Sequence, residues 1–61
     1  MLTHEVAIIE FLRVPKGMID IAEHFGWDSQ YTIKLINNLL NYGHIEEINK
    51  NTPDRPLYKT V

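Results

Sequence analysis

A chain of 61 residues is long enough for one domain, near the lower size limit for domains that fold without disulfides or a structural metal. Its composition, 44% hydrophobic and 23% charged with no cysteine, is that of a globular protein and excludes disulfides and thiolate metal sites. The net charge is −2, and basic side chains outnumber acidic ones only in residues 29–61, so only the C-terminal half could present a cationic face to nucleic acid.

The first predicted element is a helix that starts at Thr3, whose hydroxyl can cap a first-turn amide. Apolar side chains then recur at helical spacing, with charged residues between them, at Val6, Ile8, Ile9, Phe11 and Leu12. Pro15 and Gly17 are poor helix residues and predict the end of this element.

A second, shorter helix is predicted over residues 18–25. Its apolar positions have helical spacing and are Met18, Ile21, Ala22 and Phe25. Gly26 follows where a helix commonly ends in a left-handed residue. No residue before Met18 is a good side-chain cap, so the start of this helix is the less defined end.

The third predicted helix covers residues 29–42, with Asp28 as a strong N-cap and Gly43 as its end. An α-helix turns by about 100° per residue, so residues that share one side of it can be read from the sequence. The side expected to face the core consists of Thr32, Ile33, Ile36, Leu39 and Leu40. Polar residues fall on the opposite side, and Tyr31 lies at the edge of that polar face.

The remainder reads as a β-hairpin. Residues 44–49 and 57–61 are rich in Ile, Tyr, Thr and Val, and a polar segment with two prolines, residues 50–56, separates them. The expected fold is therefore α+β, one domain over residues 1–61 with three helices followed by a two-stranded hairpin. The side chains expected to be buried together are Ile9, Leu12, Ile21, Phe25, Ile36, Leu39 and Ile45.

Residues 21–28 resemble the first helix and the turn of a helix-turn-helix motif. Ala22 permits close approach of two helices, and Gly26 suits a tight turn with positive φ. Residues 39–46 and the return strand 55–59 are similar to the corresponding parts of winged helix-turn-helix regulators from bacteria, archaea and viruses. The resemblance implies a winged helix-turn-helix fold in which the C-terminal hairpin is the wing.

Short segments of the chain are also similar to two smaller groups within that superfamily. Residues 9–12 and 21–23 are similar to those of small fimbrial-operon regulators, although these are common choices in the superfamily. Residues 52–58 are similar to the wing of Z-DNA-binding domains. Those domains require Asn and, four residues later, Tyr in the recognition helix, where this chain has Ile33 and Asn37, so that group is rejected.

The resemblance implies sequence-specific binding of double-stranded DNA by a small transcription regulator, with the third helix in the major groove. Amides can read adenine, lysine can contact guanine or phosphate, and hydroxyls suit phosphate oxygens at a helix N-terminus. On the helix, the residues expected to contact DNA are Ser29, Gln30, Tyr31, Lys34, Asn37, Asn38 and Asn41. On the wing they are Lys50, Asn51 and Arg55.

Other interpretations of these residues remain open. An Asn-rich stripe can be a solvated surface, although Asn is a poor helix former and three in one helix favour another explanation. A winged helix can also serve as a protein-interaction module or inhibitor, for which an acidic chain is no handicap. A module this small buries only about 600–1,000 Å² on DNA, so a homodimer or a protein partner is expected in either case.

No metal or cofactor is expected. The histidines His4, His24 and His44 form no recognisable ligand set, and His24 with Asp20 is better explained as an i,i+4 pair on a helix surface. Glu46 and Glu47 alternate along a strand and so make no acid–base dyad. Trp27 is expected to cover the core, where Phe11, Phe25 and Tyr58 also belong.

Size and apolar runs set the remaining expectations. A ligand pocket needs about 300 Å³ or more, which such a small core leaves little room for, so an enzyme is not expected. No apolar run is long enough to span a bilayer and residues 1–9 lack the features of a signal peptide, which favours a cytoplasmic protein without a membrane partner. The minimal size also suggests an origin in a virus or mobile element.

Overall fold

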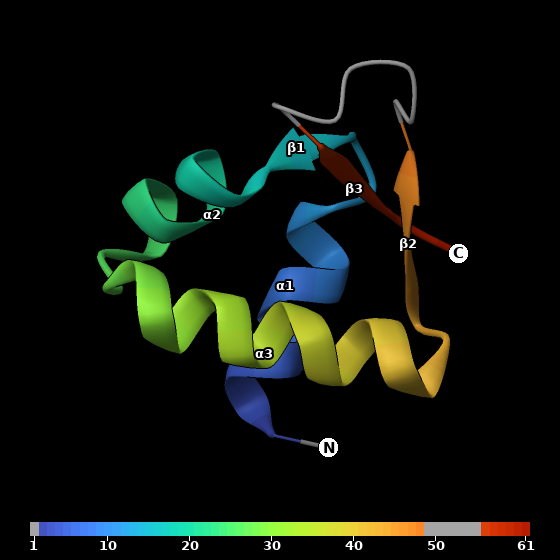
Figure 1. The fold of residues 1–61 in the computed structure, drawn as a ribbon, viewed down its shortest axis with the longest axis horizontal. Coiled ribbons are helices and arrows are strands. Elements are labelled where there is room, and N and C mark those ends of the chain that lie inside the picture. Colours follow the sequence, from blue (N-terminus) through green and yellow to red (C-terminus); the bar gives the residue numbers. More distant parts are fainter. Residues whose placement is uncertain (1, 49–55) are drawn as a thin grey trace.

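The computed structural model describes residues 2–48 and 56–61. Within these ranges the chain forms three helices, α1 (Thr3–Phe11), α2 (Met18–Phe25) and α3 (Ser29–Tyr42). The strands there are β1 (Lys16–Gly17), β2 (Ile45–Ile48) and β3 (Leu57–Thr60). In Figure 1, α3 crosses the front of the molecule, α1 passes behind it, and the sheet lies at the end where α3 leads into β2. The α+β class predicted from the sequence is confirmed.

The sheet has one strand more than the predicted hairpin. Its order is β1-β3-β2 and both pairings are antiparallel. Lys16 lies opposite Tyr58 and Gly17 opposite Leu57, so the segment between α1 and α2 pairs with the C-terminal strand. At its other end β3 joins α1, because the Thr60 N–H donates to the Leu12 carbonyl at 2.9 Å. The C-terminal strand thus contacts both the end of α1 and the segment that leads into α2.

Glycines end two of the helices as predicted. Gly26 follows α2 with φ 72°, and Gly43 follows α3 with φ 79°. Both are left-handed conformations, in which a Cβ atom is strained, and each amide donates to a carbonyl of the last turn. The chain can therefore reverse sharply after each helix.

The start of α1 differs from the prediction. Thr3 is the first helical residue and Leu2 is the N-cap, which has no side-chain oxygen. The Leu2 N–H instead donates to the Glu5 carboxylate at 3.0 Å. Thr3 as N-cap was wrong because Glu5, three residues after Leu2, satisfies the amide at this end of the helix.

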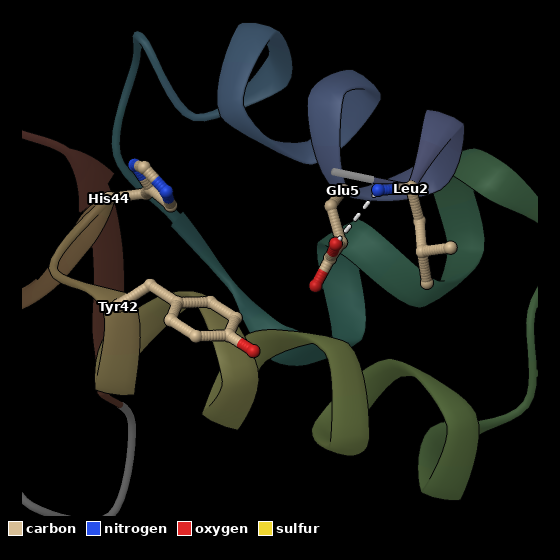
Figure 2. Close-up of a pocket in the computed structure, with 4 residues that line it drawn as sticks. All are labelled: Leu2, Glu5, Tyr42 and His44. Carbon is tan, nitrogen blue, oxygen red and sulfur yellow. Dashed lines mark hydrogen bonds between the residues drawn. The ribbon is translucent and has the colours of Figure 1, made fainter.

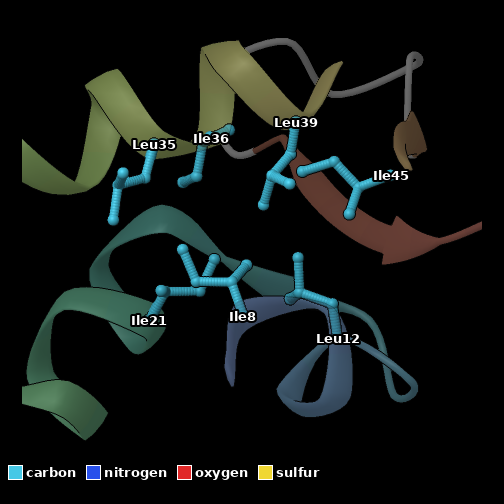
Figure 3. Close-up of a cluster of buried hydrophobic side chains, with 7 residues drawn as sticks. All are labelled: Ile8, Leu12, Ile21, Leu35, Ile36, Leu39 and Ile45. Carbon is cyan, nitrogen blue, oxygen red and sulfur yellow. The ribbon is translucent and has the colours of Figure 1, made fainter. Parts of the chain in front are cut away.

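The core lies between α3 and the two other helices, and β2 closes one end (Figure 3). Its buried apolar residues are Ile8, Leu12, Ile21, Leu35, Ile36, Leu39 and Ile45. Five of these were predicted, but Ile9 and Phe25 only pack against the cluster and are half-buried. Ile8 and Leu35 occupy the buried positions instead, because α1 and α3 are turned about their axes relative to the prediction. None of the helices within the described residues has the length and apolar content needed to cross a bilayer.

Candidate nucleic-acid interface

The N-terminal end of α3 is held by a side-chain cap. The Asp28 carboxylate accepts the Tyr31 N–H at 2.7 Å, and the Thr32 hydroxyl donates to the Asp28 carbonyl at 2.8 Å. This is the capping that the sequence predicts, and it begins the helix directly after the α2–α3 turn. The N-terminal half of α3 thus has a defined position beside α2.

The outward face of α3 is polar and lies opposite the core. Gln30, Lys34, Asn37 and Asn41 are all exposed, and at 100° per residue they fall within about 60° of one another. The buried residues of the helix, centred on Leu39, lie on the other side. No acidic residue occurs within α3. The face therefore presents amide groups and one cation, which can donate to and accept from base edges.

The other predicted contact residues differ in accessibility. Ser29 and Tyr31 are exposed at the start of α3, whereas Asn38 is half-buried toward the edge of the polar face. Lys50, Asn51 and Arg55 lie outside the described residues, so the structure gives no position for the wing contacts. The structure thus brings the helix residues together on one element, with Asn38 at the margin.

Tyr31 has a partner that the sequence did not indicate. Its hydroxyl lies 2.7 Å from Nδ1 of His4, the second residue of α1. The Tyr31 ring also lies nearly perpendicular to the rings of His4 and Trp27, with centroids 5.9 and 5.4 Å away. Trp27 in turn stacks on Phe25 and packs against the core, as expected of a residue that covers it. Tyr31 therefore belongs partly to an aromatic cluster, and no sequence signal could have placed His4 in it, because the two residues are 27 positions apart.

The prediction of which α3 residues face the core was partly wrong. Ile33 is 43% exposed, and Leu35, which the prediction omitted, is buried. Ile33 lines a groove of about 740 Å³ with the first residues of α2 and of β3. Ile19 lines the same groove and is 65% exposed. An apolar surface therefore runs beside the polar face of α3, between the helix and the sheet.

Charge around the candidate interface is mixed. Lys34 is the one charged residue of α3, while Asp28 and Asp20 lie at its N-cap and in the neighbouring groove. On the sheet, Lys59 lies opposite Glu46 across the β2–β3 pair, and both are exposed. A strong attraction for phosphate from the described residues alone is not expected.

His24 packs against an aromatic ring of α1. The His24 ring stacks on Phe11 with centroids 4.1 Å apart, rather than forming a hydrogen bond with Asp20 among the described residues. Within residues 2–48 and 56–61, no three potential metal ligands lie close enough together to hold an ion.

Burial, and to a lesser extent the Glu47 carboxylate, raises the pKa of the Tyr58 hydroxyl above its ordinary value of 10.

No family model, curated protein or solved structure matches this chain.

Proposed function

We propose that this chain binds duplex DNA as a winged helix-turn-helix module, with α3 as its recognition helix. The observation that carries the proposal is the outward face of α3. Its central residues Gln30, Lys34, Asn37 and Asn41 are exposed, share about a sixth of the helix circumference, and have no acidic neighbour on the helix. Amides of this kind form paired hydrogen bonds with adenine in the major groove.

The connection between α2 and α3 supports the same proposal. A short turn that contains left-handed Gly26 and the capping residue Asp28 joins the two helices. In helix-turn-helix proteins this arrangement lets the second helix enter the groove while the first crosses the backbone. Antiparallel β2 and β3 follow α3, and residues 49–56 between them are the proposed wing, with Lys50 and Arg55 as phosphate contacts.

The proposed biological role is that of a small, sequence-specific transcription regulator. One module of this size buries about 600–1,000 Å² of protein surface on DNA, which is at the low end for specific complexes. A second copy or a protein partner would therefore be required for tight binding at an operator.

Fluorescence anisotropy with a selected duplex, measured over a series of salt concentrations, tests this proposal. Replacing a cation that contacts phosphate reduces the slope of log affinity against log salt by about one unit. We expect this reduction for Lys34→Ala, Lys50→Ala and Arg55→Ala. Lys16→Ala is the matched control, because Lys16 lies on β1 with its ammonium 5.4 Å from the centre of the Phe11 ring, and it belongs neither to α3 nor to the proposed wing. The proposal fails if the folded protein binds no duplex, or if Lys16→Ala changes the slope as much as the others.

A second candidate function is that of a protein-interaction module, and the groove beside Ile33 favours it. Two exposed isoleucines, Ile19 and Ile33, line this groove together with the Asp20 carboxylate. Exposed apolar side chains beside a charge are typical of a protein contact surface. Binding through this groove would lose little affinity with added salt and would be weakened by Ile19→Ser, whereas DNA binding through α3 would depend steeply on salt.

A further inference from the structure

A pocket lies where the start of α1 meets the C-terminal end of α3, away from the polar face of α3. Its volume is about 480 Å³, and its lining residues are Leu2, Glu5, Tyr42 and His44 (Figure 2). Leu2 and Glu5 come from the N-terminal end of α1, and Tyr42 and His44 flank the left-handed Gly43. The DNA-binding proposal uses none of these four residues.

Glu5 is the unusual member of this group, because only 5% of it is exposed. One carboxylate oxygen accepts the Leu2 N–H at 3.0 Å, and in Figure 2 the other oxygen points away from that bond, toward the side where Tyr42 lies. The ion pair found among the described residues joins Arg13 to Glu10, and none there involves Glu5. The Leu2 N–H is its one hydrogen-bond partner among the described residues, and burial deprives the carboxylate of most of its hydration, so it attracts a cationic group that enters the pocket.

The other walls suit a cation with an apolar stem. The Tyr42 ring is 72% exposed and can offer its face to a positive charge. Leu2 is 59% exposed and can cover methylene groups. The His44 ring centroid lies 6.2 Å from that of Tyr42, which gives the pocket a second aromatic wall.

We propose that this pocket binds an alkylguanidinium or alkylammonium group, such as the side chain of arginine or lysine. The cationic head pairs with the second carboxylate oxygen of Glu5 and lies against the Tyr42 ring, and the stem lies along Leu2. The group can come from a second copy of this chain, through Arg13, or from a different molecule. Arg13 is available because its bond to Glu10 joins side chains that are 72% and 61% exposed, and such surface pairs contribute little.

An NMR titration with propylguanidinium chloride, with propanol as the neutral probe, tests the site. We expect saturable shifts of the Leu2, Glu5, Tyr42 and His44 amides with propylguanidinium but not with propanol. Glu5→Gln keeps the size of the side chain and an oxygen for the Leu2 N–H, and should weaken binding about tenfold, equivalent to about 1.4 kcal/mol. Glu46→Gln, an exposed carboxylate on β2, is the matched control and should leave the affinity unchanged.

Tyr42→Leu provides a second variant that leaves the carboxylate in place. Because Tyr42 is mostly exposed, this change should preserve the fold while weakening the propylguanidinium affinity several-fold. The proposal is overturned if the shifts do not saturate, if they centre on Glu46 and Glu47, or if neither Glu5→Gln nor Tyr42→Leu changes them.

Sedimentation velocity then distinguishes the sources of the cation. Self-association that both Glu5→Gln and Arg13→Gln abolish assigns the natural cation to a second copy of the chain. A chain that stays monomeric but binds propylguanidinium assigns it to a different molecule. Neither result depends on DNA binding, so this inference and the proposed function can fail separately.

Discussion

The helices α3 and α1 divide their side chains differently between core and solvent. In α3, the buried side is apolar apart from Thr32, and the opposite side carries amides and Lys34. In α1, Ile8 is buried, yet Leu2 and Val6, at or near its start, are 59% and 48% exposed. The comparison shows that packing explains only one side of each helix. The core does not determine the polar side of α3 or the exposed apolar residues Leu2 and Val6 at the start of α1.

Truncating the buried side of α3 should have the largest effect. Leu39 is fully buried, so Leu39→Ala should cost about 2–5 kcal/mol of unfolding free energy, enough to unfold most of a domain this small. Val6→Ala, on the exposed side of α1, is the aliphatic control and should change stability by about 0.5 kcal/mol or less. Thermal unfolding followed by circular dichroism measures both. If both variants lost the same unfolding free energy, the buried side of α3 would not differ from the exposed side of α1 as described.

This difference between the helices also explains what the sequence could predict. The extents of α2 and α3 followed from apolar spacing and from local signals, namely Asp28, Gly26 and Gly43, because a cap depends on residues within one turn. The orientation of α3 about its axis was less accurate. Its apolar residues cover more than one side, so the pattern alone could not exclude Ile33 or require Leu35.

Long-range pairing could not be predicted at all. Strand β1 has two residues, too few to show an alternating pattern, and it forms only because β3 returns beside it. The same holds for the contact of His4 with Tyr31 and for the burial of Glu5, both of which depend on α1 lying against α3. The shared exposed face of Gln30, Lys34, Asn37 and Asn41, in contrast, followed directly from helical periodicity.

The next prediction concerns the polar side of α3. Gln30→Ala and Asn37→Ala should each cost about 1–3 kcal/mol of binding free energy on the preferred duplex and relax discrimination at one base pair. Neither removes a charge, so the salt dependence should stay that of the parent chain. Anisotropy with selected and scrambled duplexes measures this, and Val6→Ala is the control that should bind as the parent does. A loss of equal size on both duplexes would contradict base reading by these amides.

The starts of the two helices offer a smaller test. Asp28 caps the start of α3 with its side chain, whereas the N-cap of α1 is Leu2, which has no side-chain oxygen. Asp28→Ala should therefore destabilise the chain by about 0.5–2 kcal/mol, and Asp28→Asn should restore most of the loss because Asn is also a good N-cap. Chemical denaturation measures these changes. If Asn proved as damaging as Ala, the carboxylate charge rather than the cap would be responsible.

The smallest expected effect concerns β3, which links the end of α1 to the strand that follows α3. Burial and then Glu47 raise the pKa of the half-buried Tyr58 hydroxyl above 10, so the folded chain holds this proton more tightly than the unfolded chain. The stabilisation that this provides is complete below pH 10, and it is lost as the pH rises through the raised pKa of the folded state. Tyr58→Phe has no proton to lose, and its melting temperature should therefore fall less than that of the parent chain between about pH 9 and pH 11. Tyr42→Phe removes a mostly exposed hydroxyl and should follow the parent chain, which separates burial at β3 from the general effect of alkali on tyrosines. An identical fall for all three proteins would show that the environment of Tyr58 contributes nothing to alkaline unfolding.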